Sequence, residues 1–421
     1  MPTTLISFIG RGRDSEPGEP GGSRSGYSLT EYDFGGGRVR KSTFFGWTLL
    51  QHLRDEGVAP DKWLIIGTAG SLWGGLADVL EGDVPDTVIE WAHDVLEQDK
   101  RSGCVEQALL DRAPAELPGL LGVGKVALEI VDECRDRESQ HCLMSLFLRH
   151  LEENDEVILD VTHSYRHLPI MAAFMMSPLR WLRGVKVRGI YYGALDMRRE
   201  NGGISPVVDL SICADYNRKD SILATFATTG DYSEAASLFP DAAGDLSQTS
   251  FLEKIARMGD ARAPARRVMD ELEKTDAVDP LLAGIGSKLQ DALRWSREGR
   301  FPQRMLEKSR FLLERGEYMN SLILCLESIF KKVFQTHFQG DPNNYDEETS
   351  WEIKNLLKRN LVPPWNDVFR GLNDLRNAAV HGTRASRKEV QPALRSEEEF
   401  KALLERGMDL AGKLISGEIS L

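Results

Sequence analysis

The 421-residue sequence lacks the marks of several large protein classes. Its five cysteines form no C-x-x-C pair and leave one over, which argues against a disulfide scaffold and a thiolate zinc site. Its eight histidines are scattered without an H-E-x-x-H motif, so we expect no metal centre. The longest apolar run, residues 168–182, is interrupted by Pro169, Pro178 and Arg180. It falls short of the roughly 20 residues that cross a membrane, so we expect no membrane association.

The start of the chain also lacks the basic, apolar and small-residue regions of a signal peptide. The first ten residues, MPTTLISFIG, are instead typical of a buried strand. Hydrophobic content of 41% and charged content of 28% are normal for a globular protein. We therefore expect a cytoplasmic protein, with two or three domains for this length.

Basic charge is scarce overall, because the formal net charge is −13. This argues against a broad nucleic-acid-binding surface. The distribution is uneven, however: residues 285–388 hold 18 Lys or Arg against 13 Asp or Glu. This local excess predicts an anion-binding site in that segment.

The first half of the chain alternates strand and helix patterns. The predicted strands are residues 3–9, 62–68, 155–164 and 185–195, and residues 31–42 are typical of a hairpin. The predicted helices are residues 42–57, with Ser42 or Thr43 as N-cap, and a buried helix over 168–184. Near-continuous apolar strands that alternate with helices predict a Rossmann-like α/β domain with a mostly parallel sheet. Residues 10–26, rich in Gly, Pro and Ser, predict a flexible excursion.

The second half is all-α by pattern. Strand signals vanish after about Asp220, and helical spacing covers residues 304–335, 351–360, 365–382 and 397–415. We therefore predict an α/β domain over 1–215, a helical linker region over 216–300 and a helical bundle over 301–421.

Two glycine-rich stretches match nucleotide-binding motifs only in part. The sequence GRGRDS, which begins at Gly10, lacks the third glycine of a dinucleotide fingerprint and does not lead into a helix pattern. GLLGVGKV fits the G-x4-G-K pattern, but Val126 replaces the hydroxyl residue that a phosphate loop needs for magnesium. Neither a dehydrogenase nor a phosphate-loop enzyme is favoured.

Polar residues follow three predicted strands, where ligands bind in open α/β sheets. The third of these ends in DVTHSYRHLP, and Pro169 favours a helix start whose free amides face this turn. The candidate ligand-binding residues are Gly10, Arg11, Thr68, Ser71, Thr162, His163, Ser164 and Arg166. Such donors suit phosphates joined to a polar base or ribose. Alternatively, Thr68 and Ser71 only cap a helix, Asp160 fixes a turn and His163 is structural.

A second candidate site lies in LRNAAVHG near the end of the chain. We predict a helix with Leu372, Leu375 and Ala379 inward and Gly382 as its stop. Arg376 and His381 lie about 140° apart on such a helix, whereas Asn377 and His381 share a face.

Two copies of this helix across a twofold axis would bring two Arg376 and two His381 side chains around one phosphate. Imidazole can move the proton of an RNA 2′-hydroxyl and guanidinium can offset phosphate charge, without a metal. The alternative is that Arg376 pairs with Asp374 or Asp367 and that His381 is a surface residue.

Together these segments resemble the CRISPR-associated CARF–HEPN ribonucleases of type III systems. DVTHSYRHLP resembles the D-x-T-H-G/S signature of one branch, with Ser164 in the usual Gly position. RNAAVHG resembles the HEPN R-x4-6-H motif, and residues 316–334 resemble the preceding HEPN helix, with Glu327 on its apolar stripe.

The resemblance implies an antiviral endoribonuclease that forms a homodimer or a higher homo-oligomer. A cyclic oligoadenylate, such as cyclic tetra- or hexa-adenylate, would bind the CARF half as activator, and no other cofactor would be required. Single-stranded RNA would be the substrate, cut to 2′,3′-cyclic phosphates. Arg376, His381 and Asn377 would be catalytic. The alternatives are a sensor whose helical domain only binds partners, and a ring nuclease that degrades its own activator.

Overall fold

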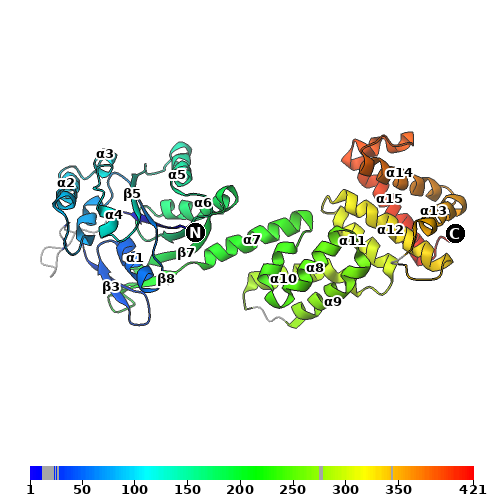
Figure 1. The fold of residues 1–421 in the computed structure, drawn as a ribbon, viewed down its shortest axis with the longest axis horizontal. Coiled ribbons are helices and arrows are strands. Elements are labelled where there is room, and N and C mark those ends of the chain that lie inside the picture. The colour runs from blue at the N-terminus through cyan, green and yellow to red at the C-terminus, as the bar shows by residue number, and fades with distance from the viewer. Residues whose placement is uncertain (12–22, 24, 26–27, 275–277, 343–344) are drawn as a thin grey trace. The chain divides into compact units, whose positions relative to one another are not determined.

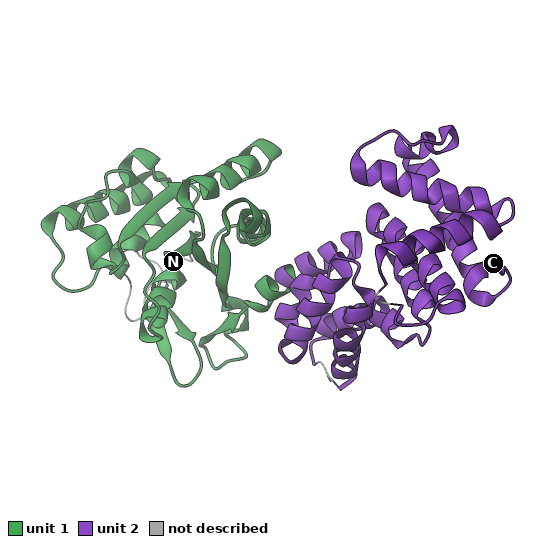
Figure 2. Cartoon of the chain, turned by 45° about the vertical axis from the view of Figure 1, so that its right-hand side comes forward, with its two compact units in different colours: residues 1–217 green, residues 218–421 purple. Residues whose placement is uncertain are grey.

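The computed structural model describes residues 1–421 except 12–22, 24, 26–27, 275–277 and 343–344 (Figure 1). The predicted excursion over 10–26 lies almost entirely outside the described residues. The described chain divides into two compact units, residues 1–217 and 218–421, which Figure 2 colours separately.

Unit 1 is built on a sheet of eight strands among its described residues. They are β1 (Thr3–Ile9), β2 (Thr30–Asp33), β3 (Val39–Ser42), β4 (Lys62–Gly67), β5 (Lys125–Ile130), β6 (Glu156–Asp160), β7 (Lys186–Gly193) and β8 (Ser205–Asp209). Their order is β3-β2-β8-β7-β6-β1-β4-β5. The run from β7 to β5 is parallel, whereas β8 is antiparallel to β7 and β3 to β2. The predicted Rossmann-like, mostly parallel sheet and the hairpin are confirmed.

Helices cover both faces of this sheet (Figure 1). They are α1 (Phe45–Asp55), α2 (Asp86–Ser102), α3 (Gln107–Leu110), α4 (Leu117–Leu120), α5 (Arg137–His150) and α6 (His167–Arg183), with short 3-10 turns η1 (Trp73–Val79) and η2 (Leu195–Met197). Side chains alternate between the two faces of a strand. Leu5 and Ile65 therefore pack with α1 and α2, whereas Ile6 and Leu64 pack with α5 and α6.

Two strands escaped the sequence prediction. β5 begins at Lys125, inside the rejected GLLGVGKV motif, and β8 carries Pro206. β5 is the edge strand of the sheet, and most of its side chains are only partly buried. Such an edge strand lacks the continuous apolar run that marks a central parallel strand, which is why its pattern was weak.

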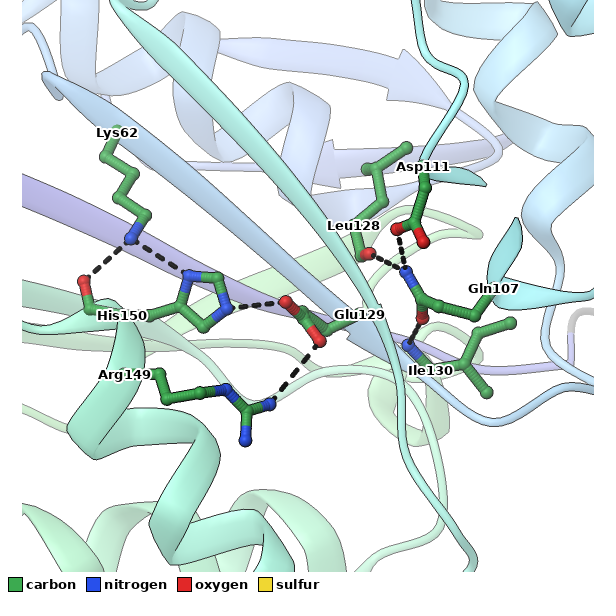
Figure 3. A network of polar contacts seen from close by, with 8 residues as sticks. All are labelled: Lys62, Gln107, Asp111, Leu128, Glu129, Ile130, Arg149 and His150. Atoms are coloured by element: carbon green, nitrogen blue, oxygen red, sulfur yellow. Dashed lines mark hydrogen bonds and ion pairs between the residues drawn. The ribbon is translucent and has the colours of Figure 1, made fainter. Parts of the chain in front are cut away.

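The exposed edge of β5 is closed by side chains (Figure 3). The Gln107 side chain donates to the Leu128 carbonyl (2.8 Å) and accepts from the Ile130 N–H (2.7 Å), and thus replaces a missing strand partner. Nearby, Nε2 of His150 lies 2.6 Å from Oε1 of Glu129. This contact contributes most to the lowered pKa of Glu129 and fixes the end of α5 to the edge strand.

The predicted buried helix over 168–184 is only half buried. In α6 the side chains of Ile170, Phe174, Trp181 and Leu182 are 57–72% exposed. An apolar sequence on every side of a helix predicts burial on every side. Here one face packs on the sheet, and the other forms an exposed apolar surface of the kind that binds other macromolecules.

Helices are the only regular secondary structure among the described residues of unit 2. Its helices are α7 (Ile212–Thr229, which spans the unit boundary), α8 (Ala243–Lys254), α9 (Met258–Lys274), α10 (Pro280–Leu293), α11 (Phe301–Leu313), α12 (Tyr318–His337), α13 (Glu347–Asn360), α14 (Trp365–His381) and α15 (Glu397–Ser416). Residues of α7 to α12 form one core and residues of α11 to α15 another. On α14, Leu372 and Leu375 are buried as predicted, whereas Ala379 is only half-buried and the buried alanine is its neighbour Ala378.

Candidate functional site

The carboxyl ends of three neighbouring strands, β6, β1 and β4, border one pocket of about 730 Å³. Five of the eight predicted residues line it: Gly10, Arg11, Thr68, Ser71 and Ser164. In the sheet, β4 and β5 lie on one side of β1, and β6 and β7 lie on its other side. Such a switch point opens a crevice at the strand ends, and this geometry explains why residues far apart in sequence converge.

Gly10 holds two of these strand ends together. A Cβ at this position would lie 2.3 Å from the backbone nitrogen of Ser164. The Gly10 carbonyl also accepts a hydrogen bond from the Leu72 N–H (2.9 Å). The close packing of the two backbones therefore requires glycine here.

Ser164 has an unusual backbone, with φ of +82°. This region is costly for residues with a Cβ, which agrees with a glycine in the signature that the sequence resembles. Its Oγ is buried and has no hydrogen-bond partner among the described residues. A buried hydroxyl without a partner on a pocket wall is available to a ligand.

Thr68 and Ser71 stabilise the turn after β4. Oγ of Ser71 accepts from the Thr68 N–H (2.9 Å), and the Thr68 carbonyl accepts from Nε1 of Trp73 (2.9 Å). The following 3-10 turn η1 has no side-chain cap, so these two residues are not helix caps. Their hydroxyls lie on the pocket wall because the turn places them there.

The three other predicted residues of the upstream site lie outside the pocket wall. Oγ1 of Thr162 accepts from the Gly193 N–H (2.8 Å), and Arg166 is exposed at the start of α6. Nε2 of His163 accepts from the Phe45 N–H (3.3 Å) at the start of α1. Burial lowers the pKa of His163 to about 4, although part of its surface stays accessible. The imidazole is therefore neutral at pH 7.

His163 takes the role that the sequence assigned to Ser42 or Thr43. The residue before α1 is Phe44, which offers no side-chain cap, so that prediction was wrong. A distant imidazole satisfies the free N–H at the helix start instead. The structural interpretation of His163 fits this geometry better than direct ligand contact.

Asp160 ends β6 as a fully buried carboxyl group. Its Oδ1 accepts from the Thr162 N–H (2.9 Å), which fixes the turn, and its Oδ2 has no hydrogen-bond partner among the described residues. Burial raises the pKa of Asp160 to about 7.

Sequence reasoning missed more than half of the pocket wall, which also includes Ala69, Gly70, Gly103, Cys104, Val131, Asp132, Glu133 and Tyr165. Residues 131–133 follow β5, so they were missed together with that strand. The signal was present, because the polar segment DECRD follows KVALEI after a single valine. Glu133 accepts from the Tyr165 hydroxyl (3.3 Å) and forms an ion pair with Arg135.

In unit 2, Arg376 lies half-buried on α14. Its Nε is buried and has no hydrogen-bond partner among the described residues. The pKa of Lys354 on α13 is lowered first by burial and then by the charge of Arg376, which shows that the two cations lie near each other. The guanidinium therefore has a second cationic side chain near it, and two cations can together bind an anion.

The alternative partners of Arg376 are otherwise engaged. Asp374 accepts from the N–H groups of Ser386 (3.0 Å) and Arg387 (2.8 Å). Asp367 pairs with Nη2 of Arg387 at 3.1 Å. The alternative that Arg376 is bound to one of these carboxylates does not fit the geometry.

The two other predicted catalytic residues occupy the end of the same helix. His381 is the last residue of α14 and is exposed, and Gly382 ends the helix with φ of +62°. Asn377 is half-buried one turn before His381. The exposed histidine agrees with the surface position that the alternative also predicted.

Glu327 is an acidic residue on the neighbouring helix α12. Its carboxylate lies 3.4 Å from Nζ of Lys331 and accepts from the Tyr345 hydroxyl (3.4 Å). Nζ of Lys331 also lies 4.0 Å from the centre of the Tyr345 ring. The Glu327 carboxylate therefore interacts with Lys331 and Tyr345.

Two further findings concern metals and membranes. The described residues contain no group of three or more His, Cys, Asp or Glu side chains able to hold a metal ion. Among the same residues, no helix combines the length and apolar content that a membrane crossing requires.

Comparisons with known proteins show similarities that include most of unit 1. Residues 4–196 match the CARF domain of the CRISPR system endoribonuclease Csx1. The CRISPR-associated protein MJ1674 of Methanocaldococcus jannaschii is 28% identical over 272 residues, which are 61% of this chain and 41% of that protein. The chain thus covers less than half of that relative's length.

Among solved structures, Enterococcus italicus Csm6 bound to cyclic hexa-2′-fluoro-hexa-dAMP aligns with a TM-score of 0.37 and 11% identity. The alignment covers 100% of this chain and 96% of that one. The family match and the curated relative agree with the sequence resemblance. Residues 4–196, a little under half of the chain, are therefore similar to a CARF domain of CRISPR-associated proteins.

Proposed function

We propose that this chain is an endoribonuclease of CRISPR defence that a cyclic oligoadenylate activates. The observation that carries the proposal is the position of the pocket. Ser164 of the D-V-T-H-S signature lies on its wall beside Gly10 and Ser71, within the residues that match the CARF domain. Ser164 of the signature therefore faces the pocket, whereas Thr162 and His163 beside it bond to the backbone of Gly193 and Phe45.

The chemistry of the wall suits a nucleotide ring. Gly10 and Gly70 allow close approach of a phosphate, and the Ser164 hydroxyl and Arg11 can donate to its oxygens. Asp132 and Glu133 would repel phosphate, but their carboxylates can accept from the exocyclic amino group of adenine. The mixed wall therefore favours adenine nucleotides over simple phosphate.

RNA cleavage is assigned to α14. In the proposed step one His381 removes the proton of the 2′-hydroxyl, and the 2′-oxygen forms a bond to the neighbouring phosphorus. The bond from phosphorus to the 5′-oxygen breaks, and that oxygen takes a proton from the protonated His381 of the second copy. The products are a 2′,3′-cyclic phosphate and a 5′-hydroxyl. Arg376 holds the phosphate and offsets the charge that develops on it, which agrees with its Nε having no partner among the described residues.

A dimer completes this site in the proposal. Arg376 and His381 are separated by about 140° on one helix, so one copy of α14 does not point both at one phosphate. Two copies related by a twofold axis can supply both groups. The exposed apolar face of α6 in unit 1 supports pairing of two chains.

An activator screen tests the proposal. The full chain is incubated with a fluorogenic single-stranded RNA and EDTA, alone and with cyclic tetra- or hexa-adenylate. We expect no turnover without ligand, turnover with one preferred ring size, and 2′,3′-cyclic phosphate ends on the products. Intact RNA with every ring would contradict the ribonuclease assignment. Bound but intact rings would then identify a sensor, and linear products a ring nuclease.

A further inference from the structure

One face of α13 combines an exposed aromatic ring with lysines. Trp351 is 64% exposed, and Lys354 and Lys358 follow it at spacings of three and seven residues. These spacings place all three side chains on the same side of a helix, over about 10 Å of its axis. The face lies opposite Ile353 and Leu357, which pack into the core of unit 2.

This face adjoins Arg376. Nζ of Lys354 lies 5.9 Å from the centre of the Phe330 ring, and Phe330 in turn contacts Phe369 of α14. Two contacts join α13 directly to α14: the Lys358 carbonyl accepts from Nδ2 of Asn366 at 2.7 Å and from Nη2 of Arg370 at 3.4 Å.

Positive charge accumulates along these helices. Residues 351–388 hold eight Lys or Arg against three Asp or Glu, in a chain whose net charge is −13. Among the described residues, neither Lys354 nor Lys358 forms an ion pair, although the charges of Glu327 and Glu347 act on Lys354 and raise its pKa. The charges of Arg376 and Lys358 both lower the pKa of Lys354, after burial, which indicates mutual repulsion between them.

We infer that α13 carries a face that binds single-stranded RNA, in which Trp351 stacks on a base and Lys354 and Lys358 contact phosphates beside the Arg376 site. An exposed tryptophan next to lysines is the arrangement that single-stranded nucleic acids require, because an unpaired base offers its flat surface and its phosphates remain accessible. A duplex hides its bases and would lose the stacking contact. The inference rests on the proposed ribonuclease function and names the residues that deliver its substrate.

The charges along this face of α13 determine the direction in which the RNA would run. Glu347 lies one turn before Trp351 at the start of α13, and its carboxylate repels phosphate. The favourable path therefore runs from Trp351 towards Lys358 and α14.

RNA binding to the full chain tests the inference. Fluorescence anisotropy with a labelled single-stranded RNA is measured in a His381→Ala background, which keeps the RNA intact. We expect Trp351→Ala to raise Kd roughly tenfold, because one base–aromatic stack is lost. Replacing Lys354 and Lys358 together by Ala should lower the slope of log Kd against log salt by about 1.4, since two phosphate contacts are lost.

Matched controls come from another part of unit 2. Phe251 is an exposed aromatic residue on α8, and Lys288 is an exposed lysine on α10. Phe251→Ala and Lys288→Ala should leave Kd within twofold of the parent. Circular dichroism verifies that each α13 variant keeps its helices.

The outcomes separate this inference from the proposed function. Unchanged Kd in folded α13 variants overturns the inference, even where activated RNA cleavage occurs. Weakened binding in these variants supports it, even where no activator ever triggers cleavage. A Trp351→Ala variant that changes the mass of the assembly and not the Kd also overturns it, because the face is then a contact between copies.

Discussion

The pocket of unit 1 is assembled from five segments of one chain, whereas Arg376 and His381 of unit 2 lie at different angles on one helix. Parallel strands end at the same edge of a sheet, so their loops converge whatever the sequence between them. A helix instead distributes its residues around an axis. A parallel sheet therefore forms a binding pocket from the loops at its strand ends. A site made of two residues on one helix instead needs a second element or a second chain.

The largest expected effect concerns the helical site of unit 2. Arg376→Ala and His381→Ala should each lower activated RNA cleavage by about 10²–10⁴-fold, because a phosphate contact or a proton carrier is lost. Activator binding in unit 1 should be unchanged. The measurements are single-turnover cleavage of a labelled RNA and calorimetric titration with cyclic tetra- and hexa-adenylate.

The controls for these variants are His337→Ala and Arg406→Ala. His337 is an exposed histidine in the last turn of α12, and Arg406 is an exposed arginine on α15. Neither should change the rate by more than twofold. Cleavage that survives Arg376→Ala and His381→Ala would remove α14 from the mechanism.

A second substitution tests the pocket of unit 1. Gly10→Ala would bring a Cβ to 2.3 Å from the Ser164 nitrogen, so the two strand ends must separate. We expect activator affinity to fall at least tenfold, while α14 is untouched. The matched control is Gly284→Ala on α10, where an added Cβ meets nothing within 4 Å. Normal affinity in Gly10→Ala would show that this backbone contact does not shape the ligand site.

The smallest effect concerns Asp160, the buried carboxyl group that ends β6 beside the pocket-lining turn. The pKa of Asp160 is about 7 in the folded chain, above its ordinary value near 4, because the group is buried. The folded state therefore keeps a proton that the unfolded state loses between about pH 4 and 7. The stability contributed by this group is full below pH 4 and is lost as the pH rises to 7.

In the Asp160→Asn variant the side chain is neutral at every pH, so the variant does not lose this stability as the pH rises. At pH 8 we expect the variant to have the higher free energy of unfolding, by a few kcal/mol at most, since each tenfold change in proton affinity is worth about 1.4 kcal/mol. At pH 4 parent and variant should be similar. Urea unfolding followed by tryptophan fluorescence measures both, with the exposed Asp83→Asn as control. Parallel pH profiles for parent and Asp160→Asn would contradict the buried neutral carboxyl.

Several features were predictable because they depend on local pattern. The apolar runs of β1, β4, β6 and β7 identified the central strands, and their ends identified five residues of the pocket wall. Helical spacing likewise identified α14 and its stop at Gly382. β5 was missed because an edge strand buries little, and Asp132 and Glu133 were missed with it.

The sequence by itself determined the mostly parallel sheet, the all-helical second half and the positions of the strand ends, because hydrophobic periodicity is a local property of the chain. Only the tertiary structure decided what each polar side chain does there. His163 caps a helix more than one hundred residues away, whereas the Ser164 hydroxyl next to it faces the pocket without a partner among the described residues. Adjacent residues take such different roles because hydrogen-bond partners are set by contacts across the fold, which no sequence pattern records.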